Sequence, residues 1–401
     1  MKIREKDLNG YKKFCLFGDK MQKSEKELEM EKLFDEMLSM NLSNYYITFH
    51  PKAAEKYGVK YKIKPLFTKT PQPYAIPYKW DYYTAKKMLY KLAEYLTAEE
   101  SERRTVIFVN PGLKDIQLFN LSAIAPTLYG GLQLIKTGEK APAHRHVPVN
   151  LRLVLEAPEN GAYIVYDGYK MELHEGDVLV QSNWMLHDHH NEGNKDLIWF
   201  AGLDAPFIIY LSAMFYEGYV VGGMEAVQEI KGSGNILINT YGNSLKPITK
   251  SLSYSSTYNP MIKYPFERVR RALYDLLENG IDDEHEGIVV EYINPITGLS
   301  ALPTISLKMR LIKPKTQLKP MRKTEHVVYV AFSGEAEIEI IESVTGKHNF
   351  KLKPHDVVII PPWSKYRIIN NNDKPSLIFS YSDEPIFKAF GLYKEEKDIK
   401  D

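Results

Sequence analysis

Two β-rich regions of the chain share one sequence pattern, and this repeat constrains the fold more than any other feature. The run GDVLVQSNW at 176–184 matches HDVVIIPPW at 355–363, an offset of 179 residues. Upstream, the run LRLVLE at 151–156 matches VYVAFS at 328–333, an offset of 177 residues. Similarity at a nearly constant offset indicates a duplicated structural unit, so we expect two copies of one fold.

The composition of each copy favours strands. Between residues 105 and 210 the chain contains the short runs TVIFV, GLQLI, LRLVLE, AYIVYDG, DVLVQ and LIWFAG, separated by Asn- and Gly-containing turns. Aromatic and β-branched residues in short runs bounded by such turns are typical of antiparallel strands. We therefore expect a mainly β protein with a barrel or sandwich in each copy.

Five of the 11 histidines lie in two clusters of the first copy, at 144–146 and 187–190. Side chains alternate along a strand, so His144 and His146 point to the same side. His187 on a neighbouring strand can supply a third imidazole, which predicts a metal site formed by these three residues.

The other residues of the second cluster divide by strand parity. His189 shares a face with His187, so we expect it beside the metal, where it donates a hydrogen bond or transfers a proton. A purely structural role is the alternative. His190 should face away, and Asp188 either orients a histidine or ends the strand as a solvated charge.

Projection of the three ligands through the repeat offsets reaches residues that do not bind metals well. His144 corresponds to Met321, His146 to Lys323 and His187 to Tyr366. The second copy has therefore lost the ligand set, and metal chemistry belongs to the first copy alone.

The overall charge and the cysteine content exclude several classes of protein. A formal net charge of +1 provides no broad field for nucleic acid or an acidic membrane surface. A single cysteine, Cys15, excludes an internal disulfide framework and fits a reducing compartment. No apolar run is long enough to span a bilayer. We expect a cytoplasmic protein that binds neither nucleic acid nor membrane.

Several ordered motifs resemble one known family. They are ERRTVIFVNPGL, APAHRH, LRLVLE, NWMLHDHH and GLDAP in the first copy and SYSDEPIFKAFGL in the second. The glycine and histidine spacings resemble the two motifs of cupin barrels, but the usual cupin glutamate is absent at Asn150 or Leu151. This combination resembles the gentisate 1,2-dioxygenase family, which includes salicylate and 1-hydroxy-2-naphthoate 1,2-dioxygenases. The likeness extends from about residue 65 to the C-terminus.

The resemblance implies a mainly β bicupin, with two double-stranded β-helix (jelly-roll) barrels and an N-terminal helical and extended arm. Helical spacing of apolar residues also predicts helices at 24–40, 83–95 and 265–279. We expect an arm at 1–100, the metal-binding barrel at 101–210, a linker with a helix at 211–286, the second barrel at 287–390 and a charged tail at 391–401.

The resemblance also implies a reaction. Fe(II) bound by His144, His146 and His187 would support insertion of both atoms of O2 into an aromatic hydroxy acid, with cleavage of the ring between the carboxyl- and hydroxyl-bearing carbons. Conversion of gentisate to maleylpyruvate is the first expectation, and salicylate or 1-hydroxy-2-naphthoate cleavage is the alternative. A zinc- or manganese-dependent cupin enzyme and a non-catalytic cupin that binds an aromatic acid also remain open. The family implies a homotetramer.

Matching positions name the residues expected to hold the substrate. Arg152 lies six residues after His146, an even spacing that aims it into the same interior, where its guanidinium suits a carboxylate. Arg104 matches a residue that closes over the pocket in relatives, and a surface charge is its alternative role.

Two uncharged residues are further candidates for the pocket. Tyr129 would flank the substrate ring and Gln133 would line the pocket, although core packing and an interior hydrogen bond explain them equally well. One departure from the family is Ala201, where many members have an aspartate, so the identity of the substrate stays open.

Overall fold

The structure, a computed structural model, describes residues 24–43, 68–98, 100, 104–114, 122–248 and 258–397. The chain divides into two compact units, Met1–Thr70 and Pro71–Asp401. In the first unit, α1 (Glu25–Ser39) matches the predicted helix and begins with a capping box between Ser24 and Glu27. Most of the predicted N-terminal arm before Pro71 lies outside the described residues.

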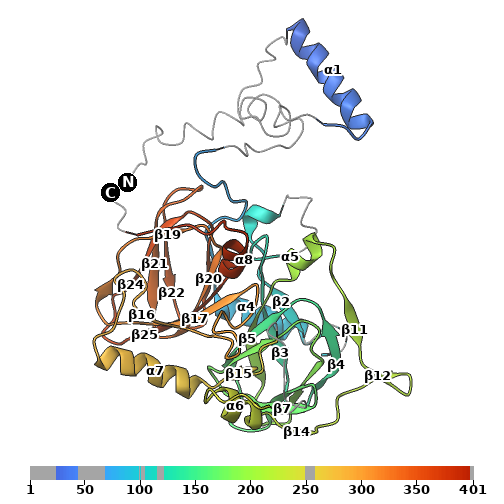
Figure 1. Ribbon diagram of the computed structural model, residues 1–401, viewed down its shortest axis with the longest axis vertical. Helices are drawn as coiled ribbons and strands as arrows, with labels where there is room; N and C mark the ends of the chain where they lie inside the picture. The colour runs from blue at the N-terminus through green and yellow to red at the C-terminus, as the bar shows by residue number, and fades with distance from the viewer. Residues whose placement is uncertain are drawn as a thin grey trace. The chain divides into compact units, whose positions relative to one another are not determined.

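The second unit is mainly β, and the predicted duplication is visible in it as two jelly rolls (Figure 1). The first jelly roll has two six-stranded sheets. One sheet has, in order, β15 (Lys263–Tyr264), β8 (Val178–Gln181), β5 (Asn150–Glu156), β10 (Leu197–Leu203), β3 (Tyr129–Ile135) and β2 (Thr105–Ile107). The other has β11 (Tyr216–Gly218), β4 (Lys140–His146), β9 (His187–Asn191), β6 (Ala162–Tyr166), β7 (Tyr169–Glu172) and β14 (Gly232–Ser233).

The second jelly roll repeats this plan, but one of its sides is divided into a four-stranded sheet and a two-stranded pair. Its six-stranded sheet has β1 (Tyr78–Trp80), β23 (Val357–Ile360), β20 (Val327–Ser333), β25 (Ser376–Ser382), β17 (Ser306–Ile312) and β16 (Ile288–Glu291). The facing sheet has β18 (Thr316–Gln317), β24 (Lys365–Asn370), β21 (Ala336–Glu342) and β22 (His348–Leu352), beside the pair β19 (Arg322–Lys323) and β26 (Glu395–Glu396). In the described residues each jelly roll is thus built of separate facing sheets, not of one continuously hydrogen-bonded barrel.

Short elements complete the unit. They are the 3₁₀ turn η2 (Pro111–Leu113), the helices α5 (Ala205–Tyr210), α6 (Asn235–Tyr241) and α8 (Glu384–Ala389), and the hairpin of β12 (Val220–Val221) and β13 (Met224–Glu225). Helices α5 and α8 each follow the last long strand of a jelly roll and each carry proline in the first turn, as expected for repeated elements. No helix among the described residues has both the length and the apolar character needed to cross a membrane.

Three apolar layers hold the jelly rolls together. One lies inside the first jelly roll and includes Val154 and Trp199, and another lies inside the second and includes Ile338 and Ile368. The third lies between the two jelly rolls, where the sheet that contains β5 and β10 faces the sheet that contains β25. There Leu153 and Phe200 of the first jelly roll share a cluster with Phe379 of the second. These sheets are therefore buried on both faces, which explains why the run LRLVLE lacks a solvent-facing polar alternation.

Each jelly roll receives an edge strand from the segment that precedes the other one. Strand β1 and helix α4 (Tyr82–Leu92) precede the first jelly roll, but β1 pairs with β23 of the second. Strand β15 and helix α7 (Phe266–Glu278) precede the second jelly roll, but β15 pairs with β8 of the first. We call residues 78–82 and 263–266, each a strand with the first residue of the helix that follows, the exchanged arms.

The exchanged arms are anchored in the same way. Asp356 of the second jelly roll accepts a hydrogen bond from the amide of Tyr82 (2.9 Å) and an ion pair from Lys79 (2.7 Å). Asp177 of the first accepts a hydrogen bond from the amide of Phe266 (3.0 Å) and an ion pair from Lys263 (2.7 Å). In both arms a carboxylate at a helix N-terminus satisfies a backbone donor and stabilises the helix dipole.

Candidate metal centre

Strands β4 and β9 bring His144, His146 and His187 together inside the first jelly roll. His144 lies opposite His187 in the strand pairing, and the potential ligand atoms of all three residues lie within 4.8 Å of one another. The ring centroids of His144 and His187 are 4.4 Å apart, and those of His146 and His187 are 5.2 Å apart. This compact group can hold a metal ion, as the spacing of the sequence predicted.

The backbone orients each of the three rings. The Nδ1 atoms face the carbonyl oxygens of Pro142, Pro148 and Met185, at 3.4 Å for His144, 2.8 Å for His146 and 3.2 Å for His187. A hydrogen bond from Nδ1–H to a carbonyl makes Nε2 the nitrogen with the lone pair and turns it away from the backbone, which is the usual arrangement of metal-binding imidazoles.

Burial favours the neutral, metal-binding form of the central histidine. His187 is fully buried, and its Nε2 atom has no hydrogen-bond partner among the described residues. Desolvation lowers the pKa of His187 well below its ordinary value, and the nearby His144 lowers the pKa further. A buried imidazole that has an unsatisfied nitrogen and lies beside two other imidazoles fits a metal ion better than it fits a packed core.

Arg152 lies in the same interior, where the even spacing from His146 predicted it. Its Nη1 donates to the hydroxyl of Tyr166 (2.8 Å) and to Oε1 of Gln181 (3.1 Å). The amide nitrogen of Gln181 lies 3.3 Å from Nε2 of His146. Gln181 therefore connects the arginine to the histidine group, and both oxygen partners of Nη1 are uncharged.

The second histidine cluster divides as parity predicted. His189 lies beside His187, with ring centroids 5.5 Å apart, and stacks on Trp199 at 5.0 Å. His190 stacks on Tyr163 at 4.4 Å and is 2.8 Å from a carboxylate oxygen of Asp188. Asp188 thus orients His190 and not a residue of the metal group.

Tyr129 and Gln133 lie on β3, and strand β10 separates β3 from β5, which carries Arg152. The strand register places all three side chains on the same face of the sheet. Gln133 accepts a hydrogen bond from the indole of Trp199 (2.8 Å) and donates to Thr105 (3.0 Å). The backbone carbonyl of Tyr129 accepts from the hydroxyl of Tyr381 (2.9 Å). Gln133 therefore has the interior hydrogen bonds that were its alternative explanation, and a substrate role for either residue stays a prediction.

Arg104 lies outside this group of contacts. Its guanidinium forms a two-pronged ion pair with Glu139 at 2.5 and 2.7 Å, and its Nε donates to the carbonyl of Leu96 at 2.6 Å. Arg104 is also buried, with only 4% of its surface exposed, which excludes the alternative of a free surface charge. Among the described residues no hydrogen bond joins Arg104 to the histidines, so its substrate role stays a prediction.

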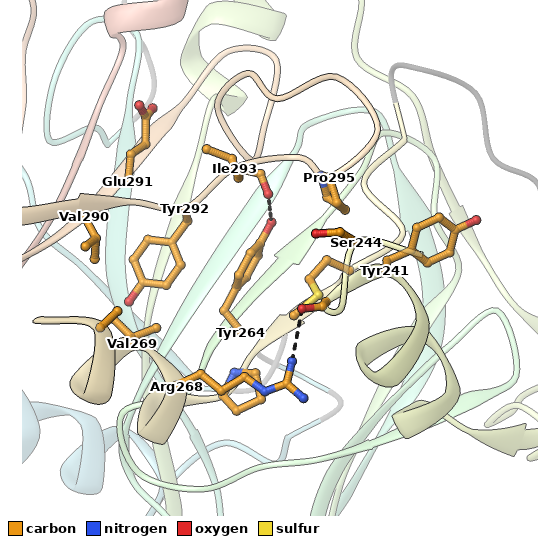
Figure 2. A pocket seen from close by; sticks show the side chains of 14 residues that line it. Tyr241, Ser244, Tyr264, Arg268, Val269, Val290, Glu291, Tyr292, Ile293 and Pro295 are labelled. Atoms are coloured by element: carbon orange, nitrogen blue, oxygen red, sulfur yellow. Dashed lines mark hydrogen bonds between the residues drawn. The ribbon is translucent and has the colours of Figure 1, made fainter. Parts of the chain in front are cut away.

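A separate cavity of about 300 Å³ lies near α7 and β16 (Figure 2). Tyr264 donates a hydrogen bond to the carbonyl of Ile293 across this cavity, and Arg268 reaches the carbonyl of Gly242 at 3.5 Å. Its lining residues include no histidine and none of the predicted site residues. The cavity is therefore distinct from the candidate metal centre.

The second jelly roll confirms the projection of the ligand positions. Met321 pairs with Tyr366 across the strands, as His144 pairs with His187 in the first jelly roll. The amide of Trp363 donates to the carbonyl of Lys323 at 2.6 Å, as that of Trp184 donates to His146 at 2.9 Å. The same backbone therefore presents methionine, lysine and tyrosine where the first jelly roll presents three histidines.

Paired charges fill the interior of the second jelly roll. Glu286 accepts from Arg310 at 2.7 Å and also from Lys323. These cations hold the pKa of Glu286 well below its usual range despite the opposing effect of desolvation, and Glu286 in turn raises the pKa of Lys323.

Several residues around the histidines were not predicted from the sequence. They are Tyr166, Gln181, Trp199 and Tyr216, of which Tyr216 stacks on His144 at 5.3 Å. Gln181 carried a usable signal, because it is the polar residue of the otherwise apolar strand VLVQ. Tyr216 carried none, because strand β11 lies in the segment interpreted as a linker.

Comparison with known proteins gives the family. No family model matches the chain. The chain is 32% identical over 335 residues to gentisate 1,2 dioxygenase 1 from Aquipseudomonas alcaligenes, covering 84% of this chain and 91% of that relative. The chain belongs to the gentisate 1,2-dioxygenase family. It is also 30% identical over 327 residues to a 1-hydroxy-2-naphthoate 1,2-dioxygenase from Nocardioides sp. (strain KP7), covering 81% of this chain and 80% of that relative.

A solved structure supports the fold of this family member. A salicylate 1,2-dioxygenase from Pseudaminobacter salicylatoxidans superposes with a TM-score of 0.76 at 22% identity, over 94% of this chain and 99% of that one. The chain is therefore a bicupin, as predicted, and a ring-cleaving dioxygenase.

Proposed function

We propose that this dioxygenase binds Fe(II) through His144, His146 and His187 and cleaves the ring of an aromatic hydroxy acid between its carboxyl- and hydroxyl-bearing carbons. Gentisate, with maleylpyruvate as product, is the first candidate substrate. Relatives named gentisate 1,2-dioxygenase occur at 32% and 30% identity, and the similar salicylate dioxygenase has been crystallised as an adduct with gentisate. The observation that carries the proposal is the joining of the histidine group to Arg152 through Gln181.

Three neutral imidazoles suit the proposed metal. Imidazole is a common ligand of divalent iron, and three such ligands leave its charge uncompensated and coordination positions open. When bound, Fe(II) would supply binding positions for the substrate oxygens and for O2, together with the redox chemistry that activates them. The family relationship favours iron over zinc or manganese, which also accept imidazole.

The proposed task of Arg152 is to bind the substrate carboxylate. Arg152 is 1% exposed, and Tyr166 and Gln181 fix one edge of its guanidinium. A planar cation in a water-poor interior binds a planar carboxylate strongly and orients the ring that carries it. Ala201 lies directly opposite Arg152 on β10, so the alanine provides no carboxylate that would compete for the guanidinium.

The proposed task of His189 is to move a proton of the substrate hydroxyl. Stacking on Trp199 holds its ring beside His187, and this restricts the imidazole to a narrow range of orientations. We propose that Tyr129 and Gln133 line the substrate site at its edge, with Gln133 holding Trp199 in place.

Two further assignments belong to this proposal. Salicylate or 1-hydroxy-2-naphthoate is the alternative substrate, favoured by Ala201 and by the naphthoate dioxygenase relative. A homotetramer is the proposed assembly, with the second jelly roll as scaffold, and light scattering of the purified protein tests it.

Oxygen uptake tests the function. Protein reconstituted with Fe(II) under anaerobic conditions should consume equimolar O2 with its substrate and yield a ring-opened product that absorbs in the near ultraviolet. Isotopically labelled O2 should place both oxygen atoms in the product, as mass spectrometry detects. Absence of uptake with gentisate, salicylate and 1-hydroxy-2-naphthoate alike would contradict the proposal.

A further inference from the structure

A buried pair of amide side chains lies inside the first jelly roll. Asn150 on β5 is directly opposite Gln181 on β8, so the two side chains share a face of the sheet. Arg152, two residues beyond Asn150, points to that same face. Asn150 is 1% exposed and Gln181 is fully buried. The amides therefore face the same interior of the jelly roll as the histidines.

The second jelly roll shows what this position holds when no metal site is present. Val327 and Ile360 form the matching cross-strand pair, and both are buried in the apolar core. Burial of an amide costs more free energy than burial of an aliphatic side chain unless the amide is fully hydrogen-bonded. The fold accepts an aliphatic pair here, so the amides of the first jelly roll are not required by the backbone.

Only one of the two amides is fully explained by its surroundings. Gln181 accepts from Arg152 and approaches His146. The carbonyl oxygen of Asn150, Oδ1, is buried and has no hydrogen-bond partner among the described residues. A buried acceptor without a donor is destabilising in the protein alone, and a ligand that brings a donor removes this cost.

We propose that Asn150 determines substrate specificity by accepting a hydrogen bond from a second donor on the substrate ring, a hydroxyl or an amino group. This inference rests on the proposed function, in which Arg152 binds the carboxylate of the same molecule. A carboxylate offers no proton to Oδ1, whereas a second ring hydroxyl or amino group does. A substrate without that donor leaves Oδ1 unpaired in the complex and binds more weakly.

Anaerobic calorimetry with the Fe(II)-loaded protein tests the inference. Salicylate lacks the second donor, gentisate has a hydroxyl, and 5-aminosalicylate has an amine. The wild-type protein should bind the two donor-bearing acids about 10-fold more tightly than salicylate, or more. Asn150→Val, which copies Val327, should bring this ratio close to one and leave the affinity for salicylate within about 2-fold.

A matched variant separates the acceptor from the shape of the side chain. Asn150→Thr has the shape of Asn150→Val but keeps a hydroxyl oxygen, so it should retain part of the preference. Val327→Ala in the second jelly roll is the control for general loss of stability, and it should leave the preference unchanged. Equal losses with all three acids, or loss of bound iron in Asn150→Val, would overturn the inference.

The binding measurement uses no O2, so it separates this inference from the proposed function. Donor-dependent binding that disappears in Asn150→Val, without ring cleavage by the wild-type protein, would refute the proposed function and leave the role of Asn150 supported. Ring cleavage with no preference for donor-bearing acids in the wild-type protein would refute the role of Asn150 alone.

Discussion

In the first jelly roll His144 pairs with His187, whereas in the second Met321 pairs with Tyr366 at the same place in the strands. The position of Arg152 is taken in the second by Tyr329, whose hydroxyl lies 2.7 Å from that of Tyr366. One backbone therefore supports two kinds of interior. The first presents three imidazoles beside an arginine that donates hydrogen bonds to uncharged oxygen atoms, and the second neutralises its own charges with ion pairs.

This difference shows which residues the fold needs and which the chemistry needs. Asn191 and Asn370 form matching hydrogen bonds in the two jelly rolls. Asn191 donates to the carbonyl of Ile135 at the end of β3, and Asn370 donates to the carbonyl of Ile312 at the end of β17. Residues that agree between the copies in this way belong to the scaffold. Residues that differ, such as Asn150 and Val327, are the ones to test for function.

The largest expected effect comes from removing a ligand in the first jelly roll. His146→Ala should lower the iron bound per chain and reduce oxygen uptake by more than about 100-fold, because two imidazoles cannot replace the three that converge here. Met321→Leu is the matched change in the second jelly roll, and it should leave both quantities unchanged. Elemental analysis and an oxygen electrode measure them, and full iron content in His146→Ala would show that the ligand assignment is wrong.

A large effect on stability is expected in the second jelly roll. Glu286→Gln leaves Arg310 buried without its carboxylate and takes from Lys323 the nearest of its three, so the free energy of unfolding should fall by about 3–5 kcal/mol. Denaturant unfolding measures this loss. The matched exposed pair is Glu217 with Arg145, where Glu217→Gln should cost at most about 1 kcal/mol. Similar losses in the two variants would mean that the buried network adds nothing to the stability of its jelly roll.

Asp204 in the first jelly roll should make the free energy of unfolding depend on pH. Burial raises the pKa of Asp204 to about 6, above the ordinary value of 3.8, although Thr304 and the amide of Val149 donate hydrogen bonds to it. A raised carboxyl pKa stabilises the fold at pH values below about 4, and this contribution is lost as the pH rises through 6. It amounts to roughly 3 kcal/mol, at 1.36 kcal/mol per pH unit.

Asp204→Asn should remove this contribution. The difference in the free energy of unfolding between the wild-type protein and the variant should then change between pH 4 and 6 and be constant above pH 7. Asp383→Asn, at the equivalent position in the second jelly roll, is the matched control. It also removes a buried carboxylate, but one that has a histidine partner, since His326 lies 2.8 Å from it. A constant difference across the whole range would contradict the raised pKa of Asp204.

The smallest expected effect compares the exchanged arms. Lys263→Met breaks the buried ion pair with Asp177 and should cost about 1–3 kcal/mol, with backbone amides still bound to the aspartate. Lys79→Met breaks the equivalent pair with Asp356 and should cost less, since a quarter of the Lys79 side chain is exposed (26%). Thermal unfolding ranks the two, and a larger loss for Lys79→Met would mean that the arms are not equivalent.

Strand parity and the repeat were sufficient to predict most of the candidate site. Alternation placed His144, His146, His189 and Arg152 in one interior, and the offsets placed Met321 opposite Tyr366. These predictions succeeded because they depend on the period of a strand, which is local. The helices α1, α4 and α7 were predictable for the same reason, from the spacing of their apolar residues.

Long-range contacts set the limit of the sequence predictions. Arg104 finds Glu139 across a separation of 35 residues, which no local pattern reveals. Strand β15 lies in a segment interpreted as a linker, because two residues show no period, and only its pairing with β8 makes it part of a sheet. Gln181 contacts both Arg152 and His146 because of the way two sheets face each other, and the sequence of β8 does not contain that information.

The exchanged arms also affect how the chain folds during its synthesis. Strand β8 of the first jelly roll has to wait for β15, which is made more than 80 residues later, before its outer edge is paired. Strand β1 is made first of all the described strands and has to wait for β23, near the end of the chain. Neither jelly roll can therefore complete its sheet from its own part of the chain during synthesis. If the chain were cut between the two repeats, each fragment would carry the edge strand that the other one needs.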